Sequence, residues 1–377
     1  MIRLSILLLA FLIFVIWRIV RRKRALKWAR TSFDPAAYGM PPRERLDASR
    51  SGPPEPLEKR ERSLAIAEAA WAGNWRPAAE YVAEPGDHWD ERWSRLELLR
   101  SIALQGDGDG WLTAWRTAEP GNCDAATLEA ELMVHRAWQI RGSGYGHEVA
   151  EDAAKQFREM LPAAIESARR AALLDPANPG PWVVIVTAAR GAQLDHTEFQ
   201  EAWDELMKRA WYHYAGHWQG MQYWCEKWFG SNKKMMEFAE HAMDVAPPGS
   251  PLGGIYLHAL AELEERKSSA SALAEDKTKW RLERLAASLR QVRPDDEHLP
   301  ALRHLLASYA CEVGLWDIAL EQFRAIGPWC GARPWTKHDD PAALFDIMRG
   351  VAVKRSKAEP LAAELRPTKN AEQQHRQ

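Results

Sequence analysis

Hydrophobic residues in the body of the chain recur every three or four positions, the spacing that places them on one face of an α-helix. No segment shows the strict alternation of a half-buried β-strand. Glycine- and proline-rich breaks separate the periodic segments. Clear examples are residues 64–71, 89–99, 157–165, 203–210 and 302–309. The pattern predicts an all-α fold.

One apolar run has a composition that favours a β-strand. Residues 183–186 are Val-Val-Ile-Val, and β-branched side chains are common in sheets. The run follows Pro181, a residue suited to the first turn of a helix, and it leads into Thr-Ala-Ala-Arg-Gly. We therefore predict a buried helix here.

Two distant stretches share one template, GNWRPAA at residues 73–79 and GLWDIAL at residues 314–320. The glycine can end a first helix because it tolerates positive φ, the tryptophan opens a second helix, and the small alanine allows two helices to approach closely. Residues 174–182 (LDPANPGPW) combine a helix stop with a helix start between them. These features predict pairs of helices that stack as repeats.

Residues 301–327 resemble one tetratricopeptide-type helix pair, with Gly314 at the turn and Ala319, Leu320 and Phe323 on the inward face of the second helix. The units between the templates have irregular lengths. The resemblance implies an irregular tetratricopeptide-like α-solenoid of stacked helix pairs, whose first helices form a concave binding face.

A wider resemblance covers about residues 60 to 335. It is carried by residues 137–144 (AWQIRGSG), 174–182, 189–191 (ARG), 227–231 (KWFGS) and 246–252 (APPGSPL). Together they resemble an uncharacterised bacterial family, domain of unknown function 4034, although Phe229 departs from its usual glycine. The resemblance implies an all-helical bacterial domain and no particular activity.

The first residues differ from the rest of the chain. Residues 4–17 are apolar apart from Ser5, and about 19 residues, from 2 to 20, would cover roughly 28 Å, close to the thickness of the bilayer core. Basic residues follow this stretch, whereas in a cleaved signal peptide they would precede it. We predict a single-pass helix with anchor residues Leu4, Leu8, Phe11, Phe14 and Trp17, and with topology set by Arg21, Arg22, Lys23 and Arg24.

The positive-inside rule places the residues after this helix in the cytoplasm, so we expect a protein of the bacterial inner membrane with its body in the cytoplasm. The basic residues could also contact anionic lipids. We divide the chain into an anchor with its basic flank (1–24), a semi-rigid proline-rich linker (25–60), a helical-repeat domain (61–350) and a disordered polar tail (351–377).

The distribution of charged residues along the chain bears on which ligands it can bind. The first 30 residues contain eight Lys or Arg and no Asp or Glu, which leaves 42 basic and 52 acidic residues in positions 31–377. An acidic body disfavours nucleic acid as a ligand. The four cysteines form no C-x-x-C pair, and we expect buried, reduced thiols.

The 19 tryptophans are either core residues that fill gaps between helices or a ligand-binding surface. They are densest, together with histidines, at residues 211–231. Two functional interpretations apply to this cluster: the aromatic residues line a groove for a protein or peptide, or His213 and His217, four apart on a helix, begin a metal site completed by His241 or His258. The structural alternative is a packed core with Ser231 capping the next helix. The candidate binding residues are Trp211, His213, His217, Trp218, Trp224, Trp228 and Ser231.

No catalytic motif stands out elsewhere. The glycine-rich residues 141–147 lack the features of a phosphate-binding loop, and residues 106–110 (GDGDG) lack the closing glutamate of a calcium loop. We expect no cofactor. The leading hypothesis is a membrane-anchored, non-catalytic scaffold that binds another protein, with self-association possible. The alternative is a metal-dependent hydrolase that uses the region of His213 and His217.

Overall fold

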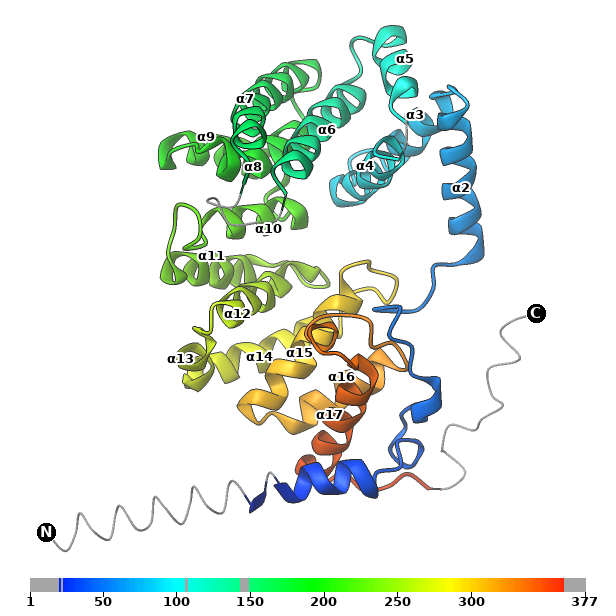
Figure 1. Cartoon of the computed structure of the whole chain (residues 1–377), viewed down its shortest axis with the longest axis vertical. Helices are drawn as coiled ribbons and strands as arrows, with labels where there is room; N and C mark the ends of the chain where they lie inside the picture. Colours follow the sequence, from blue (N-terminus) through cyan, green and yellow to red (C-terminus); the bar gives the residue numbers. More distant parts are fainter. Residues whose placement is uncertain (1–19, 22, 106–107, 143–148, 363–377) are drawn as a thin grey trace, which may run out of the picture. The chain divides into compact units, whose positions relative to one another are not determined.

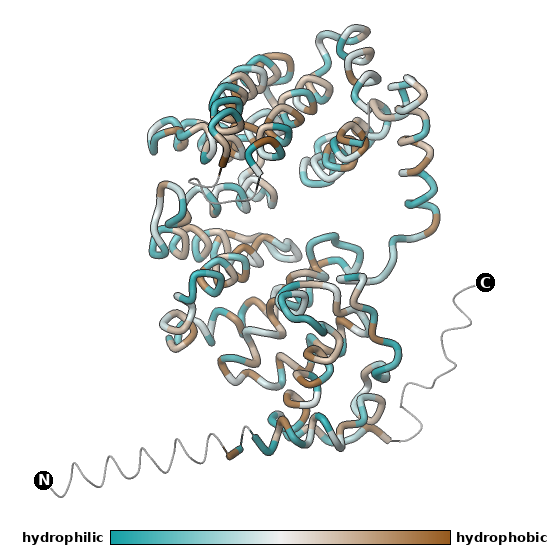
Figure 2. The backbone as a smooth tube through the Cα atoms, in the orientation of Figure 1, coloured by the Kyte–Doolittle hydropathy of each residue, from teal (hydrophilic) through white to brown (hydrophobic). Residues whose placement is uncertain are grey.

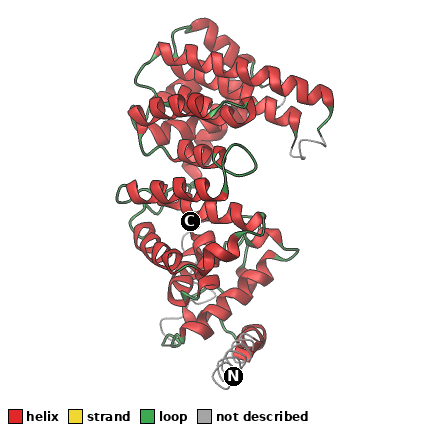
Figure 3. Cartoon of the chain, turned by 90° about the vertical axis from the view of Figure 1, so that its left-hand side faces the viewer, coloured by secondary structure: helices red, strands yellow, loops and turns green. Residues whose placement is uncertain are grey.

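The computed structural model describes residues 20–21, 23–105, 108–142 and 149–362. Within these residues the regular structure is helical, and β-structure is limited to one isolated bridge between Asp47 and Trp329 (Figure 3). The predicted all-α fold is confirmed. Each helix carries both hydrophobic and hydrophilic residues, as expected for amphipathic elements (Figure 2).

The chain folds as two compact units. Unit 1 contains residues 1–54 and 248–377, and unit 2 contains residues 55–247. The predicted helical-repeat domain, 61–350, is therefore divided between two units.

Unit 2 is a succession of helices in which most helices contact the next helix in sequence. In addition, α4 contacts α6, α6 contacts α8, and α8 contacts α10 (Figure 1). The elements are α2 (Leu57–Trp71), α3 (Arg76–Ala83), α4 (Trp89–Ala103), α5 (Gly110–Ala118), α6 (Cys123–Arg141), α7 (Glu151–Leu174), α8 (Gly180–Ala192), α9 (His196–Ala210), α10 (Tyr214–Tyr223) and α11 (Asn232–Val245).

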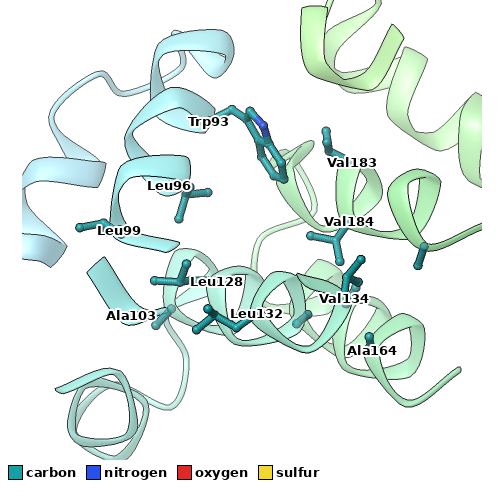
Figure 4. Packing of buried hydrophobic residues seen from close by; sticks show 14 of the residues in the cluster. Trp93, Leu96, Leu99, Ala103, Leu128, Leu132, Val134, Ala164, Val183 and Val184 are labelled. Atoms are coloured by element: carbon teal, nitrogen blue, oxygen red, sulfur yellow. The ribbon is translucent and has the colours of Figure 1, made fainter. Parts of the chain in front are cut away.

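The core of unit 2 lies where these helices meet. Leu96 of α4, Leu128 of α6, Ala164 of α7 and Val184 of α8 belong to one buried cluster (Figure 4). Residues 183–186 lie in α8 and are at most 1% exposed, so the predicted buried helix is confirmed. Full burial of such side chains contributes about 1.5–3 kcal/mol each.

The shared template has the predicted local geometry in both units. Gly73 and Gly314 have φ of 83° and 84°, and the amide of the residue after each one donates a hydrogen bond back to the preceding helix. This left-handed conformation at a helix end favours glycine. The alanines of the template, Ala78 and Ala319, are fully buried.

The junction at residues 174–182 is held by a buried polar network. Asn178 is 2% exposed, and its side-chain oxygen accepts a hydrogen bond of 2.8 Å from the Gly180 amide. Its side-chain nitrogen donates to the Asp124 carboxylate at 3.2 Å. The same carboxylate accepts two hydrogen bonds from the Arg92 guanidinium, at 3.0 and 2.6 Å. The network joins α4, α6 and the start of α8.

Unit 1 combines the start of the chain with its last third. An N-terminal helix, described at residues 20–21 and 23–31, precedes the short 3-10 turns η1 (Ala36–Tyr38) and η2 (Arg43–Arg45). The later elements are η4 (Pro251–Gly254), α12 (Ile255–Glu265), α13 (Ser269–Ala274), α14 (Asp276–Leu289), α15 (Leu299–Val313), α16 (Trp316–Ile326), η5 (Trp335–Lys337) and α17 (Pro341–Ser356).

Residues 25–46, predicted as part of a linker, instead form part of the unit 1 core. Ala25 and Ala29 pack against Val351 of α17, and Phe33 and Met40 are buried in the main cluster of the unit. Residues 25–31 are helical, and the proline-rich backbone that follows packs against the same core. The linker prediction was therefore wrong for these residues.

Buried arginine contacts fasten this segment to α17. Arg349 is fully buried; its guanidinium donates hydrogen bonds to the Pro41 carbonyl (2.9 Å) and to the Asp346 carboxylate (2.5 Å). Arg43 also binds Asp346 and donates to the carbonyls of Ala29 and Phe33. One carboxylate thus joins two arginines across more than 300 residues of sequence.

A buried histidine makes a further link at the end of the same segment. The Trp335 indole donates to His304 Nδ1 at 2.8 Å, and His304 Nε2 lies 2.9 Å from the Ser51 carbonyl. Because Nδ1 accepts and a carbonyl can only accept, His304 is neutral with its proton on Nε2. Burial lowers the pKa of His304 to about 4, which keeps this pattern intact at neutral pH.

The end of the chain also differs from its prediction. The polar tail was predicted to begin at residue 351, but α17 continues to Ser356, and residues 351–353 are buried. Residues 363–377 lie outside the described residues.

Among the described residues, no helix combines the length and the apolar character needed to span a bilayer. The predicted anchor residues Leu4, Leu8, Phe11, Phe14 and Trp17 lie outside the described residues, as does Arg22. Arg21, Lys23 and Arg24 lie on the N-terminal helix of unit 1.

Candidate binding face of unit 2

Both histidines of the predicted site are buried in unit 2. His213 is 1% exposed and caps the N-terminus of α10, where its Nδ1 accepts a hydrogen bond of 3.2 Å from the Gly216 amide. His217 is 3% exposed, and its Nδ1 lies 2.9 Å from the His213 carbonyl. Burial lowers the pKa of His217 to about 4. In both residues the Nδ1 atom is hydrogen-bonded to the backbone at the start of α10.

This arrangement gives no support to a metal site. His241 belongs to unit 2 and His258 to unit 1. Among the described residues, no group of three or more His, Cys, Asp or Glu side chains is placed to hold a metal ion. Two histidines on one helix turn therefore serve as a cap and a core side chain.

The other predicted residues have separate surroundings. Trp211 is 47% exposed at the end of α9, whereas Trp218 is half-buried on α10. Trp224 packs against His196 and Phe199, with ring centroids 4.9 and 5.7 Å away. Ser231 caps α11 by accepting a hydrogen bond from the Lys234 amide, as the structural alternative predicted.

Trp228 packs in a different part of unit 2, against α6. Its ring meets the edge of Trp138 on α6 at a centroid distance of 5.7 Å. The Arg141 and Arg190 guanidiniums lie over the Trp138 ring at 5.5 and 5.1 Å. Trp138 is thus the centre of a half-buried group of aromatic and cationic side chains that comes from α6, α8 and the segment after α10.

A row of polar side chains begins at this group and crosses four helices. Arg190 of α8 donates a hydrogen bond to Gln219 of α10. On α6, His135 lies 3.8 Å from Glu131, and Glu131 accepts a 2.5 Å hydrogen bond from Arg100 of α4. We call Arg100, Glu131, His135, Arg190 and Gln219 the polar row. Each of α4, α6, α8 and α10 contributes a side chain to it.

Burial and neighbouring charges set the ionisation of the row. Burial raises the pKa of the Glu131 carboxyl to about 7, although Arg100 acts to lower it. Burial lowers the pKa of His135 to about 4, and the positive charges of Arg100 and Arg190 lower it further. His135 is therefore neutral at pH 7 and presents both a hydrogen-bond donor and an acceptor.

The Arg100–Glu131 pair is as buried as the Arg92–Asp124 pair of the core network, and the rest of the row is more exposed. The Arg100 and His135 side chains are 17% and 36% exposed, and Arg190 and Gln219 are half-buried. Such groups can reach a ligand, and the Trp138 ring beside them offers an apolar surface. The row could not be predicted from the sequence, because its members come from four helices and form no local motif.

Other features of unit 2 offer less chemistry. A cavity of about 390 Å³ is bordered by Ala70, Trp71, Gly73 and Trp111, and its described lining contains no ionisable side chain. Cys123 and Cys225 are buried thiols, as are Cys311 and Cys330 of unit 1. Burial raises the pKa of Cys123 to about 12 and that of Cys330 to about 11, so neither is an activated nucleophile.

Comparison with known proteins gave no match to a family model, to a curated protein or to a solved structure. The resemblances noted in the sequence therefore remain predictions.

Proposed function

We propose that this chain is a membrane-anchored helical-repeat protein whose unit 2 binds another protein along the polar row. The observation that carries the proposal is the contact of α4, α6, α8 and α10 in succession, with each helix contributing to one partly exposed row. Helix pairs α6–α7, α8–α9 and α10–α11 would then be the repeats, with the even-numbered helices as first helices. This is the arrangement by which helical repeats form extended binding surfaces.

The chemistry of the row favours a polypeptide ligand. Guanidinium groups, a neutral imidazole and an amide supply hydrogen-bond donors, and Trp138 supplies an aromatic face. An extended segment rich in carbonyl or carboxylate oxygens fits these donors. Aromatic and arginine side chains are also the residue types that contribute most to protein interfaces. The uncleaved apolar segment at the N-terminus would hold this surface at the cytoplasmic side of the bacterial inner membrane.

The metal-dependent hydrolase has less support. His213 and His217 are both buried and both direct Nδ1 to the backbone of α10. A catalytic metal site keeps an open coordination position, and a fully buried pair does not offer one.

We expect the double variant His135→Ala, Gln219→Ala to bind its partner at least tenfold more weakly than the wild type. Both side chains are half-buried, and two interface residues that each contribute about 1 kcal/mol account for this loss. The full chain, tagged and expressed in its native host, would be used to capture partners from solubilised membranes. The captured protein would then be titrated with each variant.

The matched control is Glu166→Ala, Arg170→Ala on α7, an exposed ion pair with side chains 61% and 65% exposed. Thermal unfolding of both variants would check that the fold is retained. If the His135 and Gln219 variant binds the partner as tightly as the control does, the polar row is not the binding surface.

A further inference from the structure

The N-terminal helix and the end of α17 lie side by side in unit 1. Ala25 and Ala29 pack against Val351, with Leu26 and Trp316 at the border of the same cluster. The Lys354 Nζ atom lies 5.1 Å from the centre of the Trp28 ring. The dark blue helix and red α17 are adjacent in Figure 1. Two segments more than 300 residues apart therefore share one surface.

This surface is strongly basic. Lys23, Arg24, Lys27 and Arg30 are exposed on the N-terminal helix, and Arg21 is half-buried. The end of α17 adds the exposed Lys354 and Lys357, together with Arg355, whose guanidinium lies 4.8 Å from the centre of the Trp316 ring. We call this set the basic surface: Arg21, Lys23, Arg24, Lys27, Arg30, Lys354, Arg355 and Lys357.

No acidic residue occurs at positions 20–31 or 347–358. Asp346 immediately precedes the second range, and its carboxylate forms ion pairs with Arg43 and Arg349. Asp34 and Glu359 are the next acids along the chain, and both lie beyond the two basic segments. The position of Lys354 and Arg355 in the last turn of α17 is also favourable, because the helix dipole stabilises cations there.

We propose that the basic surface binds the phosphate groups of anionic phospholipids, so that unit 1 rests on the membrane through α17 as well as through its N-terminal helix. The inference rests on the membrane anchor of the proposed function. The apolar stretch ends at Val20, where the described helix begins, so the bilayer is the nearest anionic surface. Trp28 and Trp316 supply the amphipathic rings that favour the membrane interface.

The packing of residues 25–54 fixes the position of the α17 part of the basic surface relative to the N-terminal helix. A flexible linker would let the folded body move away from the lipid. Here Arg349, Asp346 and Arg43 join the segment after the N-terminal helix to α17. The contribution of α17 could not be found from the sequence, because the residues 354–357 are far from the anchor until the chain folds.

The test uses the full chain reconstituted in nanodiscs that contain a photoreactive phosphatidylglycerol or, separately, a photoreactive phosphatidylcholine. Covalent lipid adducts on residues 341–358 are measured by mass spectrometry. With the wild type we expect more adducts from the anionic lipid. In the variant Lys354→Gln, Arg355→Gln, Lys357→Gln we expect the anionic adducts to fall at least fivefold, since one cation near the surface contributes about 1 kcal/mol.

A matched control removes three cations from other elements of unit 1, in the variant Lys279→Gln, Arg284→Gln, Arg293→Gln. In this control, residues 341–358 should form as many adducts with the anionic lipid as they do in the wild type. Equal labelling by both lipids, or equal labelling of the two variants, would overturn the proposal. Salt-sensitive binding of RNA that the first variant alone loses, without a preference for anionic lipid, would overturn it in favour of nucleic acid.

Carbonate extraction of membranes tests the anchor separately. If the full chain is extracted, the anchor fails, and the basic surface is then tested by sedimentation with phosphatidylglycerol vesicles and the same two variants. Binding that only the α17 variant loses would still support the surface. Neither result depends on the polar row of unit 2.

Discussion

Replacing Asp346 with alanine is expected to lower the free energy of unfolding of unit 1 by about 3–5 kcal/mol. The substitution removes the carboxylate that binds Arg349, whose side chain is fully buried, and that also binds Arg43. The loss of the carboxylate paired with a buried arginine is strongly destabilising, because the positive charge then remains out of water without compensation. Hydrogen exchange measured by mass spectrometry across a denaturant series would report on unit 1 separately from unit 2.

The effect should extend to the beginning of the chain. Arg349 and Arg43 hold the backbone at Pro41, Ala29 and Phe33, so residues 29–43 should exchange faster in the variant. Asp295→Ala is the control, because that side chain is 75% exposed and its change should stay within about 0.5 kcal/mol. A variant at Asp346 that is as stable as this control would show that the segment is not held by these contacts.

The second large effect is expected at Asp124 in unit 2. Asp124→Ala should destabilise unit 2 by about 3 kcal/mol, because Arg92 and the buried amide of Asn178 lose the acceptor they share. The loss of stability should be largest where α4, α6 and the start of α8 meet. Denaturant-dependent hydrogen exchange of α4, α6 and α8 is the measurement.

Two further variants make this prediction specific. Asn178→Ala should cost less than Asp124→Ala, because Arg92 keeps its carboxylate. Glu166→Ala removes a surface pair of the same unit and should change its stability by no more than about 0.5 kcal/mol. If Asp124→Ala behaves like Glu166→Ala, the network does not join the helices.

Local features of the fold could be predicted from the sequence. Gly73 and Gly314 mark helix ends because few other residues adopt positive φ easily. The apolar residues at positions 183–186 could be assigned to a helix from their flanking residues alone. Each of these predictions depends on physics that acts within one or two helical turns.

The packing of residues 25–54 could not be predicted in this way. Proline content excludes a long helix, but it does not distinguish an exposed tether from extended backbone held against a core. Arg349 and Asp346, three residues apart on a helix, have the spacing of an ordinary surface pair. Only the folded unit brings Arg43 and the Pro41 carbonyl to them.

The candidate site was missed for a related reason. The density of aromatic residues at 211–231 is equally compatible with a core and with a ligand surface, and the structure buries both histidines. The polar row takes side chains from four helices between Arg100 and Gln219, so no short stretch of sequence contains its pattern. Trp228 was the predicted residue that lies beside it.

Photo-crosslinking in living cells tests the claim that unit 2 binds a protein along the polar row most directly. A photoreactive amino acid would replace the exposed Gln139, one helical turn after His135 on α6, or, as the control, Arg170 on α7, in the full chain at its native level. We predict that one protein is crosslinked from position 139 and that position 170 gives little or none of it. A partner crosslinked equally from both positions, or from position 170 alone, would contradict the account.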